Sequence, residues 1–216
     1  MRKLLWFHLL WLGACGESST APPAAHDAGT ITDAPRDIAV TTDAPRCDLG
    51  EAPVPESMLP MIRTPVVILG GDAGATAPTP SGGDPTGRWV MTAATMYLPP
   101  VARAQVDASR SYIAGTGWGV IDAETYRLSS RLEIHLDTSV VGAVVTPVRT
   151  GSRGSYTLDA GGAFTFMPAC MIEGSGASGM SQFGFSRDAP DRARLFVEVR
   201  NMALSARVVI DLQRVP

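Results

Sequence analysis

The fold is decided by the stretch TYRLSSRLEIHLD, residues 125–137 of the 216-residue chain. Apolar and polar residues alternate along it, and Ser130 is the only polar residue on the apolar face. A period of two predicts an antiparallel strand with one buried face and one solvated face. Because the stretch is long, a bend or turn near Ser129 that divides it into two strands is left open. The apolar face consists of Tyr126, Leu128, Leu132, Ile134 and Leu136.

Shorter alternating runs lie on both sides of this stretch, with turn residues between them and no convincing helical period. They fall at residues 89–98, 105–113, 140–148, 155–159, 163–167, 181–186, 194–200 and 207–213. The pair around Gly161-Gly162 predicts a β-hairpin, because glycine adopts the positive φ of a tight turn. Short strands at this spacing predict an all-β domain over residues 84–216. An antiparallel up-and-down barrel of about eight strands is favoured, and a β-sandwich is the alternative.

The segment Asp84-Pro85-Thr86-Gly87-Arg88-Trp89 opens this domain. It resembles the Gly-x-Trp entry motif of the lipocalin and wider calycin families. The resemblance implies a lipocalin-like barrel whose base is closed by Trp89, with an arginine from the final strand, Arg207 or Arg214, packed against the ring. Two family features are missing, a second motif of the Thr-Asp-Tyr type and a C-terminal helix. The other interpretation of Trp89 is an ordinary core tryptophan.

The N-terminus carries a different signal. Arg2 and Lys3 precede an apolar run over residues 4–12, which is too short to span a membrane and predicts a signal peptide over residues 1–14. The run ends in Leu12-Gly13-Ala14-Cys15, which resembles the bacterial lipobox. The resemblance implies that Cys15 is acylated and anchors the mature chain in a membrane. The same resemblance implies the outer membrane or cell surface of a bacterial envelope, because Gly16 and not Asp follows the cysteine.

Between this anchor and the domain, residues 15–60 are rich in Pro, Asp and Ala, and Thr32-Asp33-Ala34-Pro35-Arg36 recurs at residues 42–46. The few large apolar side chains of this segment would bury too little surface to offset the entropy lost when the backbone is ordered. We therefore expect a disordered linker. Residues 61–83 are expected to be extended. The apolar run at residues 66–69 is expected to pack on the domain, because a free hydrophobic segment promotes aggregation.

Charge and cysteine content narrow the partners. The formal net charge is −3, and the arginines of the domain are interspersed with acids. This argues against a nucleic-acid partner, which needs a concentrated basic face. With Cys15 acylated, Cys47 and Cys170 form an even pair, and a disulfide between them is expected in an oxidising compartment. Two free thiols, or an intermolecular bond through Cys47, are the alternatives.

No residue pattern predicts catalysis, a metal or a cofactor. His135 is the only histidine of the domain and is expected on the solvated face, as a surface side chain. The glycine-rich residues 115–119 and 174–179 are expected to be loops, because no helix follows the first to hold a phosphate and the second lacks a strand-turn-helix context. We expect a non-enzymatic interaction module with a filled barrel, acting on an envelope protein. The alternative is a hollow barrel that binds a small apolar ligand.

Overall fold

The computed structural model describes residues 47–70, 76–172, 180–201 and 204–216, and for residues 180–182, 199–201 and 204 it describes the backbone alone. The expected signal peptide, Cys15, most of the linker and the loop at residues 174–179 therefore lie outside the described residues. Among the helices that are described, none has the length and apolar character that crossing a membrane requires.

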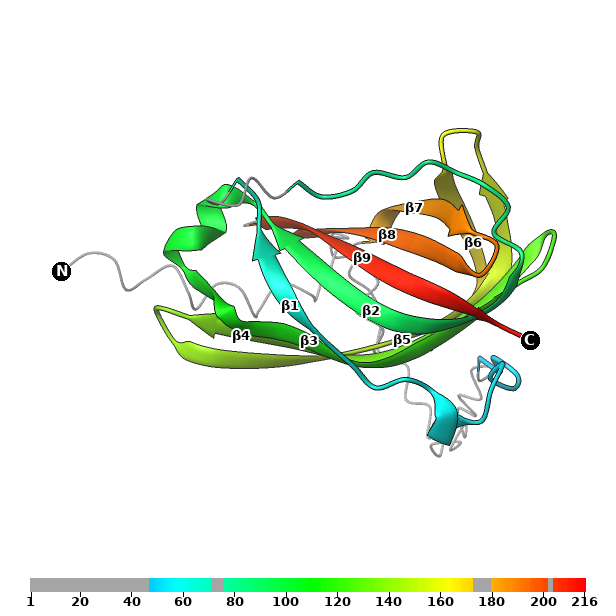
Figure 1. Cartoon of the computed structure of the whole chain (residues 1–216). Helices are drawn as coiled ribbons and strands as arrows, with labels where there is room; N and C mark the ends of the chain where they lie inside the picture. Colours follow the sequence, from blue (N-terminus) through cyan, green and yellow to red (C-terminus); the bar gives the residue numbers. More distant parts are fainter. Residues whose placement is uncertain (1–46, 71–75, 173–179, 202–203) are drawn as a thin grey trace, which may run out of the picture. The chain divides into compact units, whose positions relative to one another are not determined.

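The described chain is all-β, as the alternating runs predict. One sheet of nine strands follows the order of the chain, and the last strand pairs back onto β2, so that the sheet closes into a ring (Figure 1). Closure into one ring favours the barrel over the β-sandwich, which has two separate sheets. The strands are β1 Ile62–Ile68, β2 Gly87–Leu98, β3 Val106–Ile121, β4 Thr125–Thr138, β5 Gly142–Leu158, β6 Ala163–Met171, β7 Met180–Ala189, β8 Arg192–Asn201 and β9 Leu204–Val215. Two short 3-10 helices, η2 Glu56–Met58 and η3 Pro100–Ala104, complete the described elements.

Strand β1 is the departure from a simple up-and-down barrel. It lies between β2 and β3, parallel to β2 and antiparallel to β3, while β2 and β3 pair directly only from Gly87↔Ile121 to Val90↔Trp118. The switch of partner along β3 falls at Gly115, whose φ is +142° and whose missing Cβ would lie 2.1 Å from the Arg131 carbonyl oxygen. Only glycine permits this approach of the β4 backbone.

The glycine-rich residues 115–119 are therefore part of β3 and not a loop, which corrects the expectation from sequence. Composition alone favours a turn for such a run, but here the absence of side chains lets a neighbouring strand lie close. Strand β4 is continuous through Ser129, so residues 125–137 are not divided into two strands. The runs at residues 140–148 and 155–159 join into the single strand β5, and the hairpin around Gly161-Gly162 is confirmed.

The folded part begins earlier than residue 84. Residues 62–68 form β1, and residues 47–59 lie against the outside of the barrel, where Leu49 packs on Trp118 and Val120. We call residues 47–59 the strap. Residues 76–86 lead into β2, and Gly82 hydrogen-bonds with Phe185 and Arg187 of β7. The ordered residues therefore begin before residue 60, the expected linker end, and before residue 84, the expected domain start, and β1 includes part of the run expected to pack on the domain.

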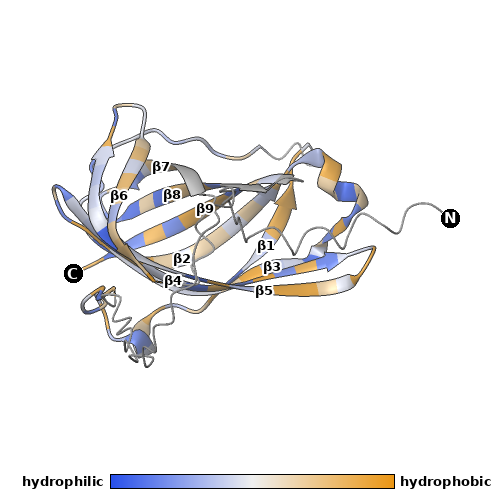
Figure 2. Ribbon diagram, turned by 180° about the vertical axis from the view of Figure 1, so that it is seen from behind, coloured by the Kyte–Doolittle hydropathy of each residue, from blue (hydrophilic) through white to orange (hydrophobic). Residues whose placement is uncertain are grey.

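Side chains from almost every strand pack together in the barrel interior. One cluster centres on Met91, Met96 and Ile113, and a second centres on Trp89 and Tyr126. Aromatic rings dominate the second cluster, with centroid distances of 4.4 Å for Tyr126–Phe166 and 4.5 Å for Phe166–Phe183. The alternating face of residues 125–137 is confirmed, since its apolar residues all belong to these clusters. Figure 2 shows the resulting alternation of apolar and polar residues along the strands.

The barrel end opposite Trp89 is less completely paired. Among the described residues, those of β5 from 142 to 150 pair only with β4, because the pairing with β6 ends at Ser152. Val144 lies opposite Leu136, on the interior face, yet it is 39% exposed. The Gly151 carbonyl oxygen accepts a hydrogen bond from the Ile172 N–H, so the backbone groups of Gly151 point away from β4. Every second residue of β5 points the same way, so the backbone groups of Pro147 also point away from β4. Proline has no N–H to offer there, which discourages pairing with another chain.

Candidate functional site

Trp89 lies at the end of the barrel where β2 begins. Its side chain is fully buried, and its Nε1 donates a hydrogen bond to the Pro85 carbonyl oxygen at 3.0 Å. The ring packs in the aromatic cluster with Tyr126 and Phe164. We call this the Trp89 end. A buried indole with a satisfied N–H contributes both apolar burial and a fixed direction for the incoming chain.

Gly87 permits the chain to enter close to the indole. Its φ is +149°, and a Cβ at this position would lie 3.2 Å from the Trp89 ring and 3.1 Å from Nε of Arg214. Arg214 is also the partner of Trp89 in the ladder between β2 and β9. A side chain at position 87 would have to displace one of these two groups, so the structure places Gly87, Trp89 and Arg214 together.

The cation over Trp89 comes from Arg187 and not from Arg207. The Arg187 Cζ lies 5.5 Å from the ring centroid. Arg207 lies opposite Tyr97, near the other end of β2, where it bonds Glu198 at 2.9 Å. Because a strand rises about 3.3 Å per residue, the seven residues from Arg207 to Arg214 carry Arg207 far from the indole. In the sequence, Arg187 lies between the alternating runs at residues 181–186 and 194–200, so nothing there indicated a role for it.

Arg187 also ties the segment before β2 to the turn between β7 and β8. Its guanidinium donates to the carbonyl oxygens of Asp84 at 2.9 Å and Pro190 at 2.6 Å, and its Nε donates to that of Ala189 at 3.3 Å. Its side chain is 17% exposed. Hydrogen bonds with one charged partner are stronger than neutral ones, and partial burial reduces the competition from water.

We expect Arg187→Ala to lower the free energy of unfolding by about 2 kcal/mol, because it removes charged hydrogen bonds and the contact over the indole. Arg192→Ala, at the start of β8 beside the same turn, is the matched control, since the Arg192 side chain is exposed and makes no hydrogen bond or ion pair with the described residues. Urea unfolding of both variants gives the comparison. Equal midpoints for the two variants would show that Arg187 does not hold this end together.

Asp84 takes part in the same arrangement. Hydrogen bonds from the Thr86 N–H and hydroxyl, both at 2.9 Å, lower the pKa of Asp84, and the charges of Arg187 and Arg214 lower it further. A carboxyl whose pKa is lower in the folded state stabilises the fold above its ordinary pKa and loses that contribution as the pH falls through the folded value. The entry turn is therefore strengthened at neutral pH.

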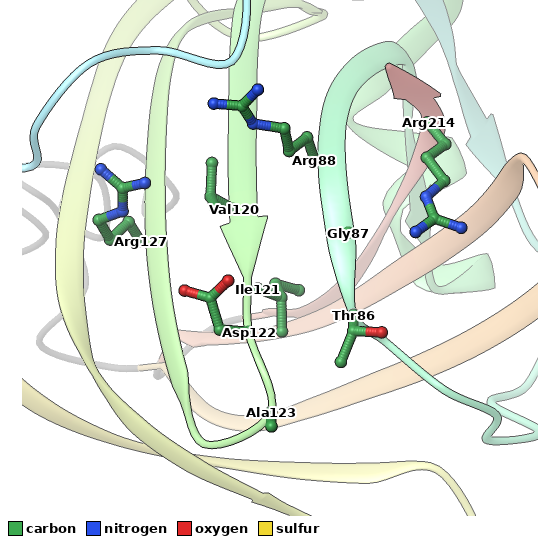
Figure 3. Close-up of a pocket in the computed structure, with 9 residues that line it drawn as sticks. All are labelled: Thr86, Gly87, Arg88, Val120, Ile121, Asp122, Ala123, Arg127 and Arg214. Atoms are coloured by element: carbon green, nitrogen blue, oxygen red, sulfur yellow. The ribbon is translucent and has the colours of Figure 1, made fainter. Parts of the chain in front are cut away.

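An open pocket of about 440 Å³ lies at the rim of the Trp89 end (Figure 3). Figure 3 shows Arg88 extending from β2 on the side of Val120 and Arg127, with Arg214 on the opposite side of β2. Asp122 is the one acidic residue of the lining. Three arginines against one aspartate make the pocket cationic. We call it the rim pocket; its lining is Thr86, Gly87, Arg88, Val120, Ile121, Asp122, Ala123, Arg127 and Arg214.

The strap bounds a second open recess of about 690 Å³ against Arg88, Trp118 and Arg131. Cys47, at the start of the strap, is bonded to Cys170 of β6, as expected from the cysteine count. The Leu49 carbonyl oxygen accepts a hydrogen bond from Arg127 at 3.2 Å, and Glu56 pairs with Arg131 at 3.7 Å. The disulfide and these contacts hold the acidic strap on an arginine-rich face.

His135 lies on the outer face, as expected, but it is not a free surface side chain. Its ring stacks on Tyr112 with a centroid distance of 4.2 Å, and its Nε2 is 3.2 Å from Glu133 Oε2. The Arg63 guanidinium lies 3.7 Å from the centroid of the same tyrosine. This stack links side chains of β1, β3 and β4, so we interpret it as a contact that stabilises the sheet. Within the described ranges, His, Cys, Asp and Glu side chains do not gather in a group that would hold a metal ion.

Comparisons with protein-family models, with curated proteins and with solved structures found no match for this chain.

Proposed function

We propose that this protein is a lipid-anchored component of a bacterial cell envelope and that its barrel is a non-enzymatic interaction module. The anchor rests on Leu12-Gly13-Ala14-Cys15 and the apolar run before it. Acyl chains on one cysteine add about 0.8 kcal/mol of membrane affinity per buried methylene, so two or three chains hold a protein durably. The outer membrane or cell surface is the proposed location, with the membrane itself as the first partner.

The packing of the interior is the observation that supports an interaction module. Side chains from facing strands, including Met91, Ile113, Leu195 and Val208, belong to one buried cluster. The aromatic cluster fills the Trp89 end. Eight or nine strands enclose just enough room for such side chains. Both recesses described above lie at the rim or on the outside, so binding is proposed to occur there, with an envelope component as partner.

Replacing the lipobox cysteine tests the anchor. We expect Cys15→Ala to abolish labelling of the protein by radioactive palmitate in the producing bacterium and to release it from the membrane fraction. Cys47→Ala is the control. It removes a disulfide cysteine and keeps Cys15, so this variant is expected to leave labelling unchanged. Equal labelling of the wild type and Cys15→Ala would contradict the proposal.

A barrel that binds a small apolar ligand is the second candidate. Two observations on the described residues favour it: residues 142–150 of β5 have no partner strand other than β4, and Val144 is exposed at the end opposite Trp89. Mass spectrometry of an organic extract of the purified protein decides between the two. A lipid present at one molecule per chain, beyond the acyl chains on Cys15, would favour the hollow barrel, and its absence would favour the filled module.

A further inference from the structure

We propose that the rim pocket binds the phosphate group of an organophosphate, a sugar phosphate or a lipid headgroup. This inference rests on the proposed function in one respect, that the barrel binds through its outside. The pocket volume of about 440 Å³ suits a single phosphorylated sugar or glycerol unit. Arginine guanidinium groups form paired hydrogen bonds with phosphate oxygens.

Two of the three arginines of the pocket, Arg88 and Arg127, belong to a row that crosses the outer face of the sheet, whereas Arg214 lies on the other side of β2. Arg88 of β2 lies opposite Val120 of β3, Val120 lies opposite Arg127 of β4, and Arg127 lies opposite Arg153 of β5. Neighbouring strands are about 4.8 Å apart, so Arg127 and Arg153 are adjacent like charges. We call Arg88, Arg127 and Arg153 the arginine row.

Such a row costs stability when nothing binds to it. Like charges directly opposite each other on an antiparallel pair are destabilising. The side chains of Arg88 and Arg153 are exposed, and neither makes a hydrogen bond or ion pair with a described residue. Arg131 and Arg149 form a second opposed pair on the same strands, and of these Arg131 is paired with Glu56. An anion bound in the rim pocket would offset the charges of Arg88 and Arg127, in the way that the carboxylate of Glu56 lies beside Arg131.

Asp122 indicates what else the ligand carries. Its carboxylate lines the rim pocket, and its contact with the Thr125 hydroxyl is long, at 3.4 Å. A carboxylate repels phosphate but accepts hydrogen bonds from hydroxyl groups. The geometry therefore favours a phosphate ester with hydroxyl groups over inorganic phosphate: the phosphate lies toward Arg88 and Arg127, and a hydroxyl lies toward Asp122.

Titration calorimetry on the purified full chain in non-ionic detergent tests the site. Glucose 1-phosphate is expected to bind more tightly than inorganic phosphate, and glucose or sodium chloride at equal ionic strength is expected to give no binding heat. Arg88→Gln is expected to weaken glucose 1-phosphate binding about tenfold, the effect of losing one charge-assisted hydrogen bond. Arg192→Gln, an exposed arginine of the same barrel end outside the pocket lining, is the control and is expected to leave the affinity within about twofold.

Asp122→Asn is expected to change phosphate affinity in the opposite direction from Arg88→Gln. It is expected to strengthen binding of inorganic phosphate and to reduce the preference for glucose 1-phosphate. If the natural ligand is a lipid headgroup, micelles doped with phosphatidylglycerol are expected to compete with glucose 1-phosphate. If the natural ligand is a soluble phosphate ester, the micelles are expected to leave the titration unchanged. Either result supports the site. Unchanged affinity in Arg88→Gln, or no heat with the wild type, would overturn the inference. Palmitate labelling is independent of this outcome, so failure of the anchor and failure of the site are distinguishable.

Discussion

Replacing Trp89 by alanine is expected to lower the free energy of unfolding by about 3–5 kcal/mol, the usual cost of removing a large buried aromatic side chain. Trp89 is fully buried at the point where the chain enters the barrel. The substitution leaves a cavity between Tyr126 and Phe164, deletes the bond from Nε1 to Pro85 and removes the ring beneath Arg187. Urea unfolding followed by far-ultraviolet circular dichroism measures the effect without relying on tryptophan emission.

Two controls separate these contributions. Trp89→Phe keeps most of the ring contact and loses the hydrogen bond, so we expect a smaller destabilisation, with the lost bond accounting for about 1 kcal/mol. Val101→Ala replaces an apolar side chain that is 64% exposed and should change stability little. If Trp89→Ala unfolded at the same urea concentration as Val101→Ala, the indole would not be a main source of stability at this end.

Removing the disulfide by Cys47→Ser together with Cys170→Ser is expected to cost about 4–5 kcal/mol in the chain-entropy model. The magnitude follows from the 123 residues that separate the two cysteines, because a crosslink over a long loop removes much freedom from the unfolded chain. Urea unfolding of the double variant against the wild type measures it. In the folded state the same bond keeps the strap over Trp118, so the variant should also show increased quenching of tryptophan emission by iodide.

Reduction supplies the control for this prediction. A reductant should shift the unfolding midpoint of the wild type toward that of the double variant and leave the double variant unchanged. The intact mass of the oxidised protein should rise by two hydrogen atoms on reduction. Alkylation of both Cys47 and Cys170 in the oxidised, denatured protein would contradict the crosslink.

Much of the sheet followed from alternation alone. Residues 125–137 predicted β4 and its buried face, because side chains on a strand point alternately to opposite sides and only one face of this sheet is buried. The hairpin between β5 and β6 followed from Gly161-Gly162 for an equally local reason. Local backbone preferences and a period of two need no knowledge of partners.

Other features depended on partners that are distant in the chain. Residues 115–119 form a strand because β4 lies along one side of them, with β2 and, at Gly115, β1 on the other. Residues 47–59 are ordered because Cys170, Trp118 and Arg127 hold them. Arg187 reaches Trp89 only because the turn between β7 and β8 lies at the same barrel end. The register of β2 to β5 likewise brings Arg88, Arg127 and Arg153 into one row.

The sequence by itself thus determined the all-β class and the buried face of β4, and it favoured the pairing of Cys47 with Cys170 over the alternatives. Tertiary structure alone decided the insertion of β1, the choice of Arg187 over Arg207 and the arginine row. The reason is physical: a strand's alternation is encoded in adjacent residues, whereas register, ring closure and the meeting of charges arise only when strands far apart in sequence pair.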